Sequence, residues 1–99
     1  MTVKYFRKRR ILNVLYIKVM DLKQLDLLKK AFGKNLQKIR ENKKMSLLEV
    51  SYNCSLDESK ISKIEHGRFN ITLSTMAELA KGLSIHQKQL LEFDFVFED

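Results

Sequence analysis

The residues best suited to bind a ligand lie between Asp57 and Gly67, where the chain reads DESKISKIEHG. At helical spacing, Ile61 and Ile64 share one face of this segment. The polar side chains point elsewhere and offer hydrogen-bond donors, acceptors and charge: Glu58, Ser59, Ser62 and Lys63. We therefore expect one face of the segment to pack against a core and the other to be free to contact a ligand.

Catalytic chemistry has almost no support in the sequence. The chain has no Gly-rich phosphate loop and no His/Cys set at metal-binding spacing. Cys54 is the single cysteine, so an intramolecular disulfide cannot form, and we interpret it as a buried core thiol. His66 and His86 are interpreted as surface residues. We expect a protein that is not an enzyme and that binds no metal or cofactor.

Two helices must position the polar face, and both carry start and stop signals. Ser46 followed three residues later by Glu49 predicts a capping box at the start of a first helix. Asp57 can cap a second helix, which Gly67 is suited to end. Two short capped helices joined by a turn of about four residues form a helix-turn-helix, the unit that lays its second helix in the DNA major groove.

The motif resembles the Xre/Cro class of lambda-repressor-like helix-turn-helix proteins. The resemblance rests on SLLEVS at 46–51 and ISKIEHG at 61–67, and with weaker matches it covers about residues 32 to 92. It implies an all-α fold, a compact five-helix DNA-binding domain. Such domains usually act as dimers on palindromic or pseudo-palindromic operators. The implied function is that of a small prokaryotic-type transcriptional regulator in the cytoplasm.

The resemblance also implies which residues contact DNA. Family members reach base edges from the first two residues of the second helix and from one residue a turn later. These positions and their neighbours are Glu58, Ser59 and Lys63, with Lys60 and Ser62 beside them. Lysine can donate to guanine and glutamate can accept from cytosine, so we predict a GC-containing half-site. A simpler role for Glu58 is to support the helix N-terminus.

Phosphate contacts are expected around the motif. Backbone N–H groups near Ser46 and Leu47, at the start of the first helix, can bind a phosphate. Basic and polar residues flank the motif in the predicted loops: Lys43, Lys44, Arg68 and Asn70. Such contacts would position the domain without reading sequence.

Arg40 and Glu65 fall on the positions that form a partly buried salt bridge in the family; the alternative is two solvated charges. Three residues depart from the family pattern. Leu47 replaces a glutamine and is expected to expose an apolar group. Ser51 replaces an alanine, and Ser55 replaces a turn glycine, where a positive φ would be unfavourable for serine.

Charge is unevenly distributed along the chain, whose formal net charge is +7. Residues 1–19 carry six basic and no acidic residues, whereas residues 20–68 carry eleven basic and seven acidic ones. Residues 69–99 carry two basic and five acidic residues. We expect the helix-turn-helix half, with its excess of positive charge, to face DNA phosphate, and the acidic C-terminal third to face something other than phosphate.

Residues 1–19 have two interpretations: a basic arm that contacts nucleic acid, or residues upstream of a true start at Met20. No cleavage site follows them, and no run of apolar residues is long enough to span a membrane. From Leu22 onward a helical pattern begins, which Gly33 either breaks into two helices or weakens. The predicted domain comprises residues 20–92.

The C-terminal part is predicted to contain two more helices and a tail. Thr72 can cap the first, and the apolar positions predicted to face the core are Leu73, Met76, Leu79, Ala80, Leu83, Leu90 and Leu91. In residues 93–99, an acidic tail, phenylalanines alternate as in a strand too short to be stable alone. The tail is expected to contact the other subunit of a dimer; it could also pair with residues 11–19 or fold back on its own core.

Two functions follow from these patterns. The first is a sequence-specific regulator that binds double-stranded DNA as a homodimer. The second is a protein-interaction module or antitoxin-like protein, with weak DNA binding, whose tail binds a partner such as a toxin. Leu47 and the acidic Glu58 favour the second, whereas Lys60, Lys63 and Arg68 favour the first.

Overall fold

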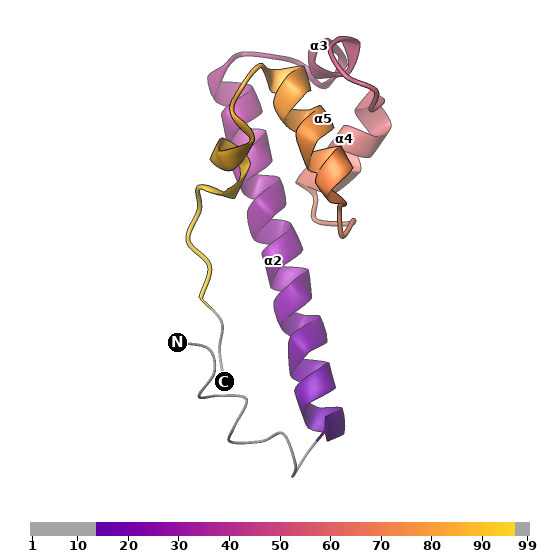
Figure 1. Cartoon of the computed structure of the whole chain (residues 1–99), viewed down its shortest axis with the longest axis vertical. Helices are drawn as coiled ribbons and strands as arrows, with labels where there is room; N and C mark the ends of the chain where they lie inside the picture. The colour runs from indigo at the N-terminus through magenta and orange to yellow at the C-terminus, as the bar shows by residue number, and fades with distance from the viewer. Residues whose placement is uncertain (1–13, 97–99) are drawn as a thin grey trace.

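Four α-helices and one 3₁₀ helix build the described part of the chain (Figure 1). This computed structural model describes residues 14–96, with side chains described from Leu22 onward. The elements are α2 (Val14–Asn42), α3 (Leu47–Tyr52), α4 (Glu58–Glu65), α5 (Leu73–Leu83) and the 3₁₀ helix η1 (Gln87–Leu91). No strand occurs between residues 14 and 96. The predicted all-α class is confirmed, with a 3₁₀ helix as its last helical element.

The long helix α2 differs most from the expectation. It has 29 residues, begins at Val14, and passes through both Gly33 and the predicted boundary at residue 20 without a break. Its length is about 43 Å at the usual helical rise, so its N-terminal half projects well beyond the other helices (Figure 1). The basic residues of the predicted arm from Lys4 to Arg10 lie outside the described residues.

The core lies among the five elements: α2 packs mainly against α4 and η1, α3 against α4 and α5, and α5 against η1. The fully buried side chains at its centre are Leu36, Val50, Ile61, Ile64, Leu79, Leu83 and Leu90. Asn35 attaches η1 to α2, because its Nδ2 donates to the carbonyl oxygens of Gln89 and Leu90, at 3.0 Å each. The last helical element is thereby held against the first.

Two leucines that were expected in the core are at the surface. Leu73 is 83% exposed and Leu91 is 55% exposed. Leu73 is the first residue of α5, at a helix end where fewer neighbouring groups can cover it. Leu91 follows Leu90 in a helix with three residues per turn, so the two side chains diverge by about 120° and only Leu90 faces the core.

The described part of the tail, residues 93–96, folds back on the core, which is one of the three placements considered for it, and forms no strand. The Phe93 ring packs edge-on against Phe32, with the ring centroids 6.5 Å apart. Phe93 and Phe95 are half-buried while Asp94 and Val96 are exposed, so the alternation appears as burial without a strand. A strand needs a neighbouring strand to pair its backbone, and residues 14–19 are helical. Residues 97–99 of the tail lie outside the described residues.

Lys44 ends α2 in a conformation that favours glycine, because its φ is +57°. The Lys44 N–H donates to Glu41 O at 2.9 Å, and the Met45 N–H donates to Arg40 O at 3.2 Å. We expect Lys44→Gly to raise the free energy of unfolding by about 1 kcal/mol in urea denaturation, since the Cβ strain is removed. Lys43→Gly, at a residue without positive φ, should give no gain. Equal effects of both changes would contradict this explanation.

Candidate nucleic-acid interface

The start of α3 is fixed by the predicted capping box. The Glu49 N–H donates to Ser46 Oγ at 3.0 Å, and the Ser46 N–H donates to Glu49 Oε1 at 2.8 Å. Two backbone donors at the helix start are therefore satisfied by side chains. The exposed end of α3 has a defined position, which a phosphate contact would require.

The turn between α3 and α4 has no strained serine. Ser55 is not among the described residues with positive φ. Its N–H donates to Glu78 Oε1 of α5 at 2.8 Å, and this bond holds the pKa of the Glu78 carboxyl below its usual range. Cys54 is half-buried in the same turn, and its thiol lies 3.4 Å from Val50 O. The turn therefore packs against the core without the expected glycine.

The helix α4 has both of its predicted end signals. At its start, Asp57 Oδ1 accepts from the Lys60 N–H at 2.8 Å. At its end, Gly67 has a φ of +74° and its N–H donates to Ile64 O, while the Arg68 N–H donates to Lys63 O, both at 3.0 Å. This pair of bonds is the Schellman motif that commonly ends helices at glycine.

Arg40 of α2 and Glu65 of α4 form a two-bonded ion pair. Arg40 Nε lies 2.7 Å from Glu65 Oε2, and Nη2 lies 3.0 Å from Oε1. Arg40 Nη1 also donates to Met45 O at 2.9 Å. The side chains are only 13% and 3% exposed, and the hydrogen bonds to Glu65 raise the pKa of the Arg40 guanidinium. The structure thus brings together the two charges and ties α4 to α2.

The outer face of α4 carries most of the predicted base-contact residues. Glu58, Ser59 and Lys63 are exposed and Ser62 is half-buried, whereas Ile61 and Ile64 are buried in the core. A shallow hollow runs along this face, and its lining consists of Ser59, Ser62, Lys63, His66 and Arg68. Hydroxyl groups and positive charges therefore lie together on an open surface.

His66 was missed by the sequence interpretation as a member of this face. Its Nδ1 lies 2.7 Å from Ser62 O, which fixes the ring over the end of α4. Its spacing of four residues from Ser62 and seven from Ser59 was the available signal, because such residues share a helix face.

Lys60 does not join the others in the hollow. Its Nζ lies 5.4 Å from the centroid of the Phe69 ring, a cation–π contact on another side of α4. Leu47 also differs from the expectation: it is half-buried and packs against the core. The other predicted phosphate-contact residues have exposed side chains: Lys43, Lys44, Ser46, Arg68 and Asn70.

In the described part of the chain, no group of three or more His, Cys, Asp or Glu residues could hold a metal ion. No helix there is long and apolar enough to cross a membrane.

Comparisons with known proteins agree with this geometry. Residues 33–93 match the family described as helix-turn-helix domain. The chain is 35% identical over 63 residues to control protein C.BamHI of Bacillus amyloliquefaciens. This alignment covers 63% of the chain and 78% of that protein. The restriction-modification controller protein C.AhdI from Aeromonas hydrophila has a similar structure, with 29% identity, a TM-score of 0.60 and coverage of 63% and 94%. A hypothetical transcription factor from Neisseria is 34% identical, with a TM-score of 0.59 and coverage of 65% and 74%.

Proposed function

Because the chain belongs to the helix-turn-helix domain family of DNA-binding transcription regulators, we propose that it binds an operator in double-stranded DNA as a homodimer. The family is not one of enzymes. The observation that carries the proposal is the open hollow on α4, where the hydroxyls of Ser59 and Ser62 lie beside Lys63 and Arg68. The proposed compartment is the cytoplasm, where a prokaryotic operator lies.

In this proposal α4 lies in the major groove and reads bases. The Lys63 ammonium donates to guanine O6 and N7, and Glu58 accepts from cytosine N4 or supports the helix start. Ser59 and Ser62 add weaker contacts, and Lys60 lies at the edge beside Phe69. The ion pair between Arg40 and Glu65 holds α4 in its orientation before DNA binds. The loss of conformational entropy of α4 on binding is therefore small.

Phosphates are bound on either side of α4. At the start of α3, the backbone N–H of Leu47 donates to one phosphate beside Ser46, whose own N–H already donates to Glu49. Lys43 and Lys44 lie before α3, and Arg68 and Asn70 lie after α4. These contacts set the register of α4 in the groove and contribute the salt-dependent part of the affinity.

The similarity to a restriction-modification controller protein makes control of such a system the biological role to test first. Selection from a pool of random DNA duplexes with the full chain tests the operator proposal directly. A two-fold symmetric sequence should be enriched, with half-site centres about 10 base pairs apart or a multiple of that spacing. Recovery of unrelated sequences would overturn it.

Lys63→Ala should weaken binding to the selected duplex by about tenfold to a hundredfold, because one base contact of 1–3 kcal/mol is lost. Fluorescence anisotropy with a labelled duplex measures this change. Lys88→Ala is the matched control: Lys88 is an exposed lysine on η1, outside the α4 hollow. An equal loss in both variants would mean that only bulk charge matters, which contradicts the proposed role of Lys63.

A second candidate function is binding of a protein partner, such as a toxin. The observation that favours it is the outer face of α3, where Leu48 and Tyr52, one turn apart, are both exposed. In that case the chain would show weak affinity for DNA of any sequence.

A further inference from the structure

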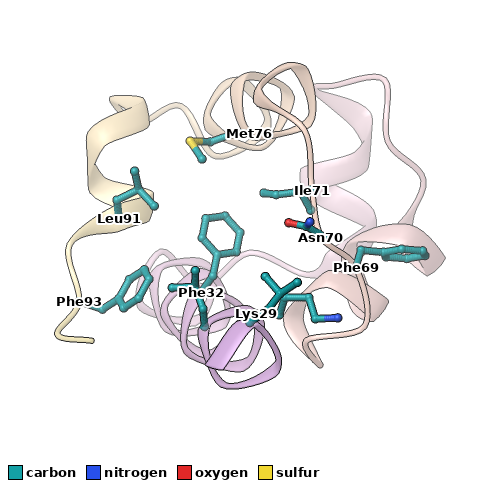
Figure 2. Close-up of a pocket in the computed structure, with 10 residues that line it drawn as sticks. Lys29, Phe32, Phe69, Asn70, Ile71, Met76, Leu91 and Phe93 are labelled. Carbon is teal, nitrogen blue, oxygen red and sulfur yellow. The ribbon is translucent and has the colours of Figure 1, made fainter. Parts of the chain in front are cut away.

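An apolar pocket of about 170 Å³ opens beside α2 (Figure 2). Leu25, Leu28 and Phe32 of α2 form one wall of it. In Figure 2, Met76 of α5 lies across the space from Phe32, and Phe93 of the tail closes one side. Separate parts of the fold therefore enclose one apolar space.

Two aromatic rings hold the wall of the pocket, while other apolar side chains that line it remain exposed. Phe32 is only 7% exposed, and the Phe93 ring meets it edge-on with the ring centroids 6.5 Å apart. In contrast, Phe69 is 38% exposed and Leu91 is 55% exposed. A bound apolar molecule would remove part of this surface from water, which is favourable.

Two polar side chains lie among the apolar ones: Lys29 of α2, which is half-buried, and Asn70 of the loop after α4. Figure 2 shows Lys29 reaching from α2 toward this loop, while the side-chain amide of Asn70 points toward the space. Within residues 22–96, no hydrogen bond or ion pair engages the Lys29 ammonium or the Asn70 amide. No acidic residue is among the described residues that line the pocket. Its polar edge therefore offers one positive charge and an amide donor.

We propose that this pocket binds a small monocarboxylate. The apolar body lies among Leu28, Phe32 and Met76, and the carboxylate accepts hydrogen bonds from the Lys29 ammonium and from Asn70 Nδ2. The volume limits the body to about six to eight carbon atoms, since an apolar protein cavity of about 150 Å³ holds benzene. The inference goes beyond the proposed function, and binding of the carboxylate does not depend on that function.

Charge favours a carboxylate over other apolar molecules of the same size. A hydrocarbon or an alcohol would cover the half-buried Lys29 without pairing its charge, which costs free energy. An ammonium group would be repelled by Lys29. A carboxylate, in contrast, accepts from both donors at the polar edge of the pocket.

The pocket adjoins the surface that is proposed to bind DNA. Asn70 is a predicted phosphate contact and also lines the pocket, and Arg68 lies two residues before it. A bound carboxylate would engage Asn70 and place a negative charge near Arg68, where it opposes a DNA phosphate. Ligand and operator should therefore weaken each other's binding by the same factor, about fivefold to tenfold. This consequence, unlike binding itself, rests on the proposed function.

NMR titration of the full chain with phenylacetate tests the site directly. We expect saturable shifts of the backbone amides around the pocket, with a dissociation constant at or below about 1 mM. Benzylamine is the matched control ligand, because it has the same apolar body and the opposite charge; it should bind at least about tenfold more weakly. The proposal is overturned if phenylacetate gives no saturable shift up to about 10 mM, or if benzylamine binds equally well.

Lys29→Gln tests the partner of the carboxylate. The change removes the charge and should weaken phenylacetate binding at least about fivefold, whereas the neutral benzyl alcohol should bind both proteins equally. Lys23→Gln is the matched control, since Lys23 is exposed on α2 and does not line the pocket. Circular dichroism checks that both variants remain helical. Equal effects of the two changes would contradict the proposed role of Lys29.

Fluorescence anisotropy with the selected duplex measures the effect on DNA. Saturating phenylacetate should raise the dissociation constant of the duplex about fivefold to tenfold, and benzylamine at the same ionic strength should not. An unchanged constant with the pocket saturated would overturn this coupling. A failure of the proposed function is distinguishable, because the duplex would then not be preferred even without phenylacetate.

Discussion

Glu65→Ala should lower the free energy of unfolding by about 3–5 kcal/mol, because it leaves a largely buried arginine without its counter-charge. In the wild type, two hydrogen bonds of 2.7 and 3.0 Å join Arg40 to Glu65. After the change, the guanidinium keeps only its bond to Met45 O among strong partners. The loss would be a large fraction of the stability of a small domain.

Urea denaturation followed by circular dichroism measures this change. Glu41→Ala is the matched control, since Glu41 is exposed and its Oε2 lies 3.9 Å from Arg40 Nη2; it should cost less than about 0.5 kcal/mol. Replacing both partners by apolar residues, as in Arg40→Met with Glu65→Leu, should cost less than Glu65→Ala alone. Equal losses of stability in the Glu65 and Glu41 variants would contradict a large contribution of the buried Arg40–Glu65 ion pair.

Gly33→Ala should lower the free energy of unfolding by about 3 kcal/mol, although alanine favours helices by about 1 kcal/mol over glycine. An added Cβ would lie 2.5 Å from Ile64 O and closer still to Glu65 O. Both obstacles are backbone atoms, which cannot move aside as a side chain does. The end of α4 would have to shift away from α2, which would also strain the ion pair of Arg40 and Glu65.

Thermal and urea denaturation measure this effect, with Lys34→Ala as the control at the next, exposed position of α2. That control should change stability by less than about 0.5 kcal/mol. A Gly33→Ala variant as stable as the wild type would contradict the close α2–α4 contact, since alanine would then fit where the geometry leaves no space.

Local signals were sufficient to predict the ends of the helices. Ser46, Asp57 and Gly67 each act through backbone groups within a few residues, so their roles can be read from spacing alone. Both motif helices begin, and α4 ends, where these residues indicate. The role of Gly33 could not be predicted in this way. Local rules describe glycine only as a residue that weakens a helix, whereas a side chain is excluded at Gly33 by the backbone of α4, about thirty residues later in the chain.

Tertiary contacts also determine the burial of the residues that differ from expectation. Leu47 was expected to be exposed where the family has glutamine, but it is half-buried and packs against the core. Leu73 and Leu91 continue apolar patterns at helix ends, where pattern does not reveal whether any neighbour covers them. The start of α2 at Val14 was missed because no capping residue marks it, whereas the place of His66 on the α4 face could have been read from its spacing to Ser62.

The most direct test of the central claim, sequence-specific DNA binding through α4, is fluorescence anisotropy of the full chain. The selected duplex is compared with a scrambled duplex of equal composition, between roughly 50 and 200 mM salt. We expect the selected duplex to bind at least about a thousandfold more tightly, with affinity for both falling steeply as salt rises. Equal and weak binding to the two duplexes would contradict the claim.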